Sequence, residues 1–165
     1  MKVLIAYASR HGSTKEVAGK IAHEMRGKGR ISVIPVQEVY DISLYDTVLL
    51  GSAIRMGKLL PEAKRFLQKF HKELASKSFY MFVVCMTMSS DTKEKRSEAL
   101  SFIKSGLNLY NLTSKDIGLF GGVFDVTKLP FPIGIIARLA KVKTEDVRDW
   151  NKIEKWARRI CRQLS

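Results

Sequence analysis

The sequence predicts a doubly wound α/β domain, in which a parallel sheet of five strands is covered by helices on both faces. Five short apolar runs recur along the chain, at 2–8, 32–36, 47–51, 79–86 and 117–123. Runs that are apolar throughout, rather than alternating, are typical of parallel strands buried on both faces. Amphipathic segments separate these runs, which favours right-handed crossovers and the strand order 2-1-3-4-5.

Three segments carry the apolar stripe of an amphipathic helix. The first follows the opening strand, the second begins after Pro61, and the third lies at the end of the sequence. Each stripe is expected to pack against the sheet. The stripes consist of Val17, Ala18, Ile21, Ala22 and Met25; of Ala63, Phe66, Leu67 and Phe70; and of Ile153, Trp156, Ala157, Ile160, Cys161 and Leu164.

Length and composition indicate one domain over residues 1–165, since 165 residues with 45% hydrophobic content can bury a substantial core. No apolar run approaches the roughly 20 residues that span a bilayer, and the opening residues become polar too soon for a signal peptide. We therefore expect a cytoplasmic protein. Cys85 and Cys161 occur in no metal-binding spacing, so they are expected to be buried free thiols.

The net charge of +13 predicts attraction to an anionic partner. Basic residues are dispersed along the helical segments, without the aromatic interleaving or zinc-finger spacing of nucleic-acid-binding modules, which argues against nucleic acid. A solvated basic face without a specific partner is the alternative.

The stretch ASRHGST, residues 8–14, lies where the first strand passes into the first helix, which is a common position for anion-binding loops. It lacks the GxxxxGK[ST] string of a P-loop, the GxGxxG string of a dinucleotide site and the cysteine of a small tyrosine phosphatase. The strand also lacks the acidic end of a response regulator. A loop that binds a phosphate without reacting with it remains, with N-capping by Ser13 or Thr14 as the alternative.

Two more loops leave neighbouring strands at the same edge of the predicted sheet. GSAIRMGK, residues 51–58, follows the third strand, and CMTMSSD, residues 85–91, leaves the fourth. The two glycines of the first of these, Gly51 and Gly57, would let backbone approach a flat ligand. One loop for a phosphate and two for a planar ring predict a site for flavin mononucleotide (FMN).

The chain resembles flavodoxin-fold proteins, because ASRHGST is similar to their T/S-x-T-G-x-T phosphate loop. Within that superfamily it is most similar to the group that contains the menaquinone-dependent protoporphyrinogen oxidase, over YASRHGSTKEVA, GSAIRMGK and DVRDWNKIEKWA. The resemblance implies that the flavin carries the chemistry, with no catalytic side chain and no metal. It also implies that the phosphate is held by Ser9, Arg10, His11, Gly12, Ser13 and Thr14, and the ring flanked by Ala53, Ile54, Arg55, Met56, Gly57, Thr87, Met88, Ser89 and Ser90.

Two departures from that group concern the flavin ring. Met56 stands where the group often has an aromatic residue, and no Trp or Tyr in the loop is available to cover the ring. Arg10, Arg55 and Lys58 surround a site that ordinary flavodoxins keep acidic. Positive charge favours the reduced, anionic flavin, so we expect a less negative two-electron potential than in an acidic flavodoxin.

An insertion over about 124–149 precedes the last helix. It contains two prolines, an apolar group that includes Ile135, Ile136 and Leu139, and flanking cations. Such a segment could lie on a membrane surface, cover a bulky apolar substrate, or pack on its own sheet or at a homo-oligomer interface.

Three functions are consistent with the sequence. The first is an FMN oxidoreductase that takes electrons from an anionic tetrapyrrole, protoporphyrinogen, and passes them to a quinone. The second is a non-catalytic electron carrier for a reductase or another redox partner. The third is a flavin-free module that binds through its basic surface.

Overall fold

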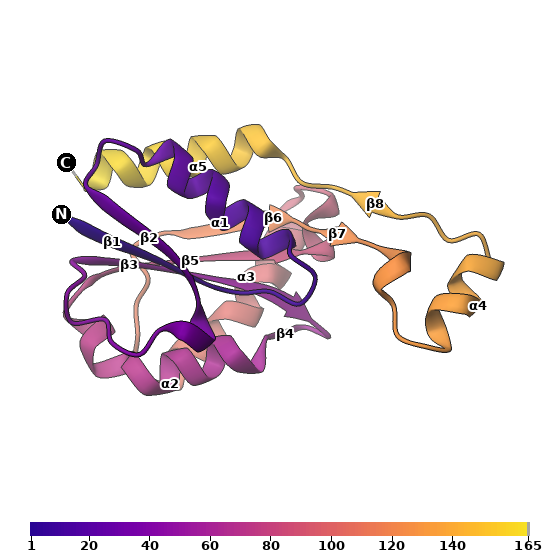
Figure 1. Cartoon of the computed structure of the whole chain (residues 1–165), viewed down its shortest axis with the longest axis horizontal. Helices are drawn as coiled ribbons and strands as arrows, with labels where there is room; N and C mark the ends of the chain where they lie inside the picture. Colours follow the sequence, from indigo (N-terminus) through magenta and orange to yellow (C-terminus); the bar gives the residue numbers. More distant parts are fainter. Residues whose placement is uncertain (165) are drawn as a thin grey trace.

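The computed structural model describes residues 1–164 as a central parallel sheet between two layers of helices (Figure 1). The strand order is β2-β1-β3-β5-β6, and every neighbouring pair is parallel. Numbered among the parallel strands alone, this is the predicted order 2-1-3-4-5, so the predicted fold class is confirmed. The strands are β1 (Lys2–Ala8), β2 (Arg30–Pro35), β3 (Thr47–Arg55), β5 (Ser78–Cys85) and β6 (Ile117–Gly121), and β4 (Lys58–Leu59) pairs antiparallel with β3.

Two helices cover each face of the sheet. Helices α1 (Ser13–Glu24) and α5 (Trp150–Gln163) pack on one face, and α2 (Pro61–Ala75) and α3 (Lys93–Asn108) pack on the other. The three predicted apolar stripes belong to α1, α2 and α5, and they face the two cores as expected. The short 3₁₀ helices η1 (Val36–Glu38) and η2 (Met86–Ser89) follow β2 and β5.

Sequence periodicity did not reveal helix α3. Its buried positions within 16 residues are only Ala99, Ile103, Gly106 and Leu107, two of which carry little or no side chain. The stripe is therefore narrow. The helix starts at a polar cap instead, where Thr92 Oγ1 accepts a hydrogen bond of 3.2 Å from the backbone N–H of Lys95.

The two cores explain why the strand runs are apolar throughout. In β1, Leu4 and Ala6 belong to the core under α2 and α3, whereas Val3 and Ile5 belong to the core under α1 and α5. All four are 0% exposed. Successive strand residues point to opposite faces, so a sheet covered twice requires apolar side chains at every position.

The predicted role of Gly51 was wrong. Strand β3 continues to Arg55, so Gly51 lies inside the sheet rather than in a loop beside a ligand. A Cβ at this position would lie 2.1 Å from the ring of Phe82 on β5. Gly51 is therefore a packing residue that makes room for an aromatic neighbour.

The insertion projects from the body of the domain as an arm (Figure 1). It contains β7 (Val123–Phe124), the 3₁₀ helix η3 (Val126–Lys128), α4 (Ile133–Leu139) and β8 (Glu145–Asp146). Strands β7 and β8 pair antiparallel at the base of the arm. Within residues 1–164, no helix combines the length and the apolar character needed to cross a membrane.

Candidate functional site

Three loops meet at the carboxyl edge of the sheet, after β1, β3 and β5. Parallel strands bring these ends together, as the sequence predicted. A cavity of about 270 Å³ lies between them and the base of the arm. Of the residues expected at the cofactor, six line this cavity: Arg10, His11, Ser13, Ala53, Ile54 and Arg55.

The first loop forms an open helix N-terminus. Gly12 precedes α1 with φ +97°, a left-handed conformation that glycine adopts without strain, and its N–H donates to Ser9 Oγ at 3.0 Å. Ser13 and Thr14 are the first two helical residues, so neither is the N-cap, and no side chain caps the helix in the described part of the chain. The N-capping alternative was therefore wrong, and the first N–H groups of α1 can serve an anion.

Thr14 provides the clearest sign that this loop is built to bind a ligand. Its side chain is 0% exposed, and within residues 1–164 its hydroxyl has no hydrogen-bond partner. A buried hydroxyl without a partner is costly, and native structures rarely leave one. A phosphate oxygen at the start of α1 would accept this hydrogen bond, so the donors of the loop fit a phosphate monoester.

The second loop is the two-residue turn between β3 and β4. Met56 and Gly57 have φ of +50° and +70°, the pattern of a tight hairpin turn, and they join the paired residues Arg55 and Lys58. Positive φ is uncommon for a residue other than glycine. Met56 is also 92% exposed, so its side chain at this turn is almost entirely open to solvent.

The third loop differs from what the sequence implied. Met88 is buried with Cys85 and Ala99 and does not line the cavity, because its side chain packs inward beneath η2. Thr87 is half-buried, and Ser89 and Ser90 are exposed.

The cavity is lined at this loop by residues that were not among the expected site residues, Val84, Cys85 and Met86. Both cysteines are buried, as expected, and neither forms a disulfide within residues 1–164. Burial raises the pKa of the Cys85 thiol, so Cys85 presents a neutral, apolar side chain to the cavity.

The charge around the loops is less positive than the sequence suggested. The Arg10 guanidinium forms an ion pair of 3.0 Å with Glu62 in the first turn of α2. Glu62 offsets much of the charge that was attributed to Arg10, and no local motif links the two residues. Arg55 and Lys58 are exposed, and they carry the positive charge that remains at the β3–β4 turn.

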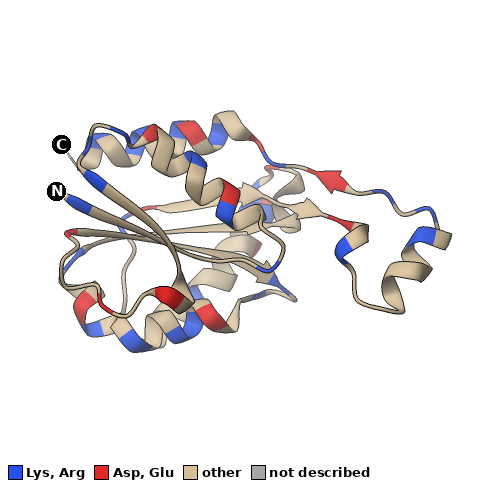
Figure 2. Cartoon of the chain, in the orientation of Figure 1, with Lys and Arg blue, Asp and Glu red and all other residues tan. Residues whose placement is uncertain are grey.

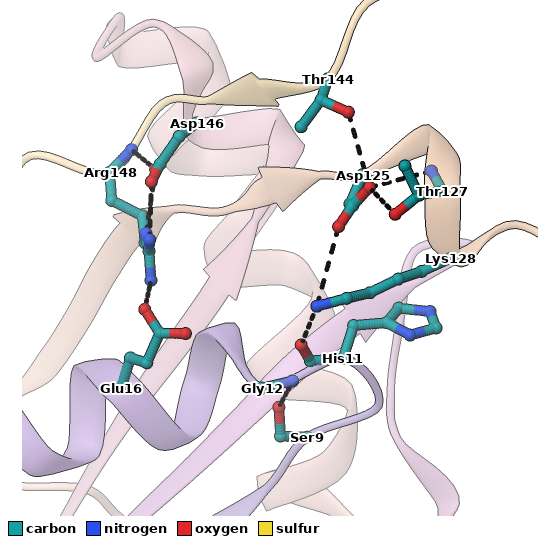
Figure 3. Close-up of polar contacts among 10 residues, drawn as sticks. All are labelled: Ser9, His11, Gly12, Glu16, Asp125, Thr127, Lys128, Thr144, Asp146 and Arg148. Carbon is teal, nitrogen blue, oxygen red and sulfur yellow. Dashed lines mark hydrogen bonds and ion pairs between the residues drawn. The ribbon is translucent and has the colours of Figure 1, made fainter. Parts of the chain in front are cut away.

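The outgoing limb of the arm, which leads from β7 into η3, is attached to the loop that precedes α1. Lys128 of η3 donates from Nζ to the carbonyl oxygen of His11 at 2.9 Å, and it lies 3.7 Å from Asp125 Oδ2 (Figure 3). Asp125 also accepts hydrogen bonds from the N–H and hydroxyl of Thr127, at 2.9 and 2.6 Å. These bonds lower the pKa of Asp125 and keep its carboxylate charged.

The returning limb of the arm, which leads from β8 back to α5, is attached to helix α1. Arg148 donates to both carboxylate oxygens of Asp146, at 2.9 and 2.6 Å, and to Glu16 of α1 at 2.6 Å (Figure 3). Its side chain is only 10% exposed. The hydrogen bonds that Arg148 donates to Asp146 raise the pKa of Arg148 and lower that of Asp146. Both limbs thus reach the start of α1 through contacts that no short motif could reveal.

The chain belongs to the flavodoxin domain family, whose model matches residues 4–149. It is similar along its whole length to oxidised flavodoxin 1 from Bacillus cereus, with 20% identity, 100% of each chain covered and a TM-score of 0.65. The rubredoxin:oxygen oxidoreductase of Desulfovibrio gigas is similar at 17% identity with a TM-score of 0.60, over 99% of this chain and 36% of that one.

Among curated proteins, the chain is similar to a protoporphyrinogen IX dehydrogenase [quinone] from Leishmania major. The two are 23% identical over 169 residues, which cover 94% of this chain and 73% of the relative. The expected flavodoxin family is confirmed by the family model. Membership of the flavodoxin domain family bears out the predicted cofactor, FMN. Among similar structures, a Fusobacterium nucleatum flavodoxin variant is itself bound to flavin mononucleotide; it is 13% identical, with a TM-score of 0.51 over 72% of this chain and 68% of that one.

Proposed function

We propose that the chain binds FMN at the carboxyl edge of its sheet and transfers electrons through it. The observation that carries this proposal is the buried hydroxyl of Thr14, which has no hydrogen-bond partner among residues 1–164 and lies at a helix N-terminus that none of their side chains caps. Flavodoxin family membership supports the identity of the ligand.

In this proposal the loop from Ser9 to Thr14 holds the phosphate. Backbone N–H groups at the start of α1 and the Thr14 hydroxyl donate to it, while Ser9 holds the N–H of Gly12 and fixes the loop. The segments 53–57 and 87–90 flank the ring. The structure supports the first of these more directly, because Ala53, Ile54 and Arg55 line the cavity.

FMN, when bound, supplies one-electron and two-electron transfer. The protein contributes the environment. Leu60, Val84 and the neutral thiol of Cys85 give the cavity an apolar lining, which limits the access of water. Arg55 and Lys58 add positive charge at the rim, which stabilises negative charge within the site.

We further propose that the electrons come from a protoporphyrinogen-type substrate and pass to a quinone. Three observations support this choice: the similarity to the Leishmania major dehydrogenase, the net charge of +13, and the position of the arm beside the cavity. Basic charge would attract the carboxylates of an anionic tetrapyrrole.

A non-catalytic electron carrier is the second candidate. It is supported by the complete mutual coverage between this chain and Bacillus cereus flavodoxin 1. In this case the protein exchanges electrons with another redox protein, and the arm serves as part of the surface that docks with it.

An absorption spectrum before and after addition of FMN, followed by anaerobic turnover, tests these proposals in order. We expect flavin uptake at one FMN per chain, and then reduction of a quinone in the presence of protoporphyrinogen. Uptake without turnover would favour the carrier. A protein that takes up no flavin would overturn both and favour the flavin-free basic module.

A further inference from the structure

We propose that residues 126–144, here named the arm tip, dock onto an anionic lipid bilayer. In this orientation the apolar side chains enter the interface and the basic side chains meet the lipid headgroups. Three separate features of the arm tip support the proposal: the exposure of its apolar side chains, the sign of its charge, and its projection from the body of the domain.

The arm tip exposes a concentration of large apolar side chains. Helix α4 has no buried residue. Phe131, Ile136 and Leu139 are 84%, 61% and 78% exposed, respectively. Of the thirteen large hydrophobic side chains that are exposed in the described part of the chain, six lie in the arm tip, whereas the others are scattered. Such a cluster marks an interaction surface.

The charge of the arm tip has one sign. It contains Lys128, Arg138, Lys141 and Lys143, and its sequence has no Asp or Glu. Lys128 is engaged with Asp125 and His11. The other three form no ion pair within residues 1–164, and Figure 2 shows basic residues, without acidic ones, along the outer part of the arm. The complement of this surface is anionic.

The shape favours a bilayer over a folded partner. The arm stands out from the body of the domain (Figure 1). Its exposed apolar side chains extend from Phe131 to Val142 rather than forming one narrow stripe. A projecting segment that is apolar over much of its surface and flanked by cations suits a fluid interface, where apolar groups enter the acyl boundary and long basic side chains reach the headgroups.

Docking would bring the cavity close to the membrane. Leu129 belongs to the arm tip and also lines the cavity, and Lys128 ties the tip to the phosphate loop. If the proposed function holds, a lipid-soluble quinone in the same bilayer would have a short path to the site. The docking itself does not depend on that function.

Vesicle co-sedimentation tests the proposal. The wild-type protein is mixed with vesicles of phosphatidylcholine alone, or with one-third phosphatidylglycerol, at low and high salt. We expect sedimentation with the anionic vesicles that weakens with salt. Lys141→Glu combined with Lys143→Glu should reduce partitioning by more than about thirtyfold, since two attractive charges are lost and two repulsive ones are added. Leu139→Glu should reduce it at both salt concentrations.

Matched controls are available on α3 and just beyond its end. Lys104→Glu changes an exposed cation, and Leu109→Glu changes an apolar side chain that is 74% exposed, both outside the arm. We expect these variants to sediment nearly as the wild type does. Flavin absorbance of every sample is recorded, and flavin-free protein is tested in parallel, so a failure to bind FMN is distinguished from a failure to dock.

Three results would overturn the proposal. The wild type could fail to sediment with anionic vesicles, or the arm variants could sediment as the wild type does. In the third, the wild type does not bind vesicles and is a dimer in equilibrium sedimentation, and Leu139→Glu dissociates this dimer. That result would show that the arm tip binds a second copy of the chain.

Discussion

Lys128 and His11 are 117 positions apart in the sequence, yet Lys128 Nζ donates a hydrogen bond of 2.9 Å to the carbonyl oxygen of His11. The contact joins the insertion to the loop that we assign to the phosphate. It uses the backbone of His11 rather than its imidazole. The peptide that precedes the helix N-terminus is thereby held by a charged donor.

Replacing Lys128 with Met should weaken FMN binding several-fold, because the phosphate loop loses an anchor while the apolar stem of the side chain is retained. Flavin fluorescence titration would measure the change. Lys64→Met, on the exposed face of α2, removes an equal charge outside these contacts and serves as the control. Equal affinities in the two variants would show that the anchor is irrelevant to the cofactor.

Thr14→Val should weaken FMN binding without lowering the stability of the flavin-free protein. The hydroxyl has no partner in the described chain, so its loss should leave the flavin-free protein as stable as the wild type or slightly more stable. FMN affinity should fall by about tenfold or more, since a hydrogen bond to a charged group contributes roughly 1.5–3 kcal/mol. Thermal unfolding and flavin titration measure the two effects, with Thr113→Val as an exposed control. Unchanged affinity would contradict the assignment of the phosphate site.

Arg55→Glu should make the two-electron potential of the bound flavin more negative. Arg55 lines the cavity but is exposed, so solvent screens its charge and the shift should be about 10–30 mV. A spectroelectrochemical titration measures it, and Lys104→Glu controls for net charge. A shift of the same size in both variants would mean that only the overall field of the protein matters.

Asp91 should contribute a small, pH-dependent increment of stability. Its ion pairs with Arg96 and Lys152 join the start of α3 to α5, and hydrogen bonds from these cations lower its pKa from 3.8 to about 2. A depressed folded-state pKa stabilises the fold above the unfolded value, and this contribution is lost as the pH falls through about 2. The side chain is 40% exposed, so solvent screening limits the effect to below about 1 kcal/mol.

Denaturant unfolding of the wild type and Asp91→Asn measures that contribution. The variant should be less stable at neutral pH, and the difference should shrink toward zero near pH 2. A difference that stays constant across this range would show that the carboxylate charge is not its source.

The layers of the fold follow from local sequence patterns, but α3 does not. Uninterrupted apolar runs identify doubly covered strands, and broad stripes identify α1, α2 and α5. Helix α3 buries Ala99 and Gly106 at two of its four inward positions, and neither contributes a strong apolar signal. The extension of β3 to Arg55 was also missed, because Ser52 is polar yet 0% exposed. Its hydroxyl accepts a hydrogen bond of 3.2 Å from the backbone N–H of Leu60.

The site was predictable where it is built from consecutive residues. The loop from Ser9 to Thr14 is one such segment, and its position after the first strand fixes its place at the sheet edge. Glu62, Lys128 and Arg148 act on that loop and its helix from distant parts of the chain. Their pairings depend on tertiary geometry, which a single sequence does not specify. Met88 packs inward with Cys85 and Ala99, at the point where the backbone of η2 departs from helical geometry, and its sequence context does not indicate this.

The arm leaves the domain and returns to it at one point. The N–H of Val147 donates to the carbonyl oxygen of Gly122 at 3.0 Å, and a Cβ on Gly121 would lie 2.1 Å from the carbonyl oxygen of Val147, so the two limbs touch backbone to backbone. When the ends of a loop are already adjacent, the entropy of closing it depends only weakly on its length. Insertions and deletions beyond this point are therefore nearly neutral for the sheet. A lineage could lengthen, trim or replace the arm to suit a new partner while the flavodoxin core remained unchanged.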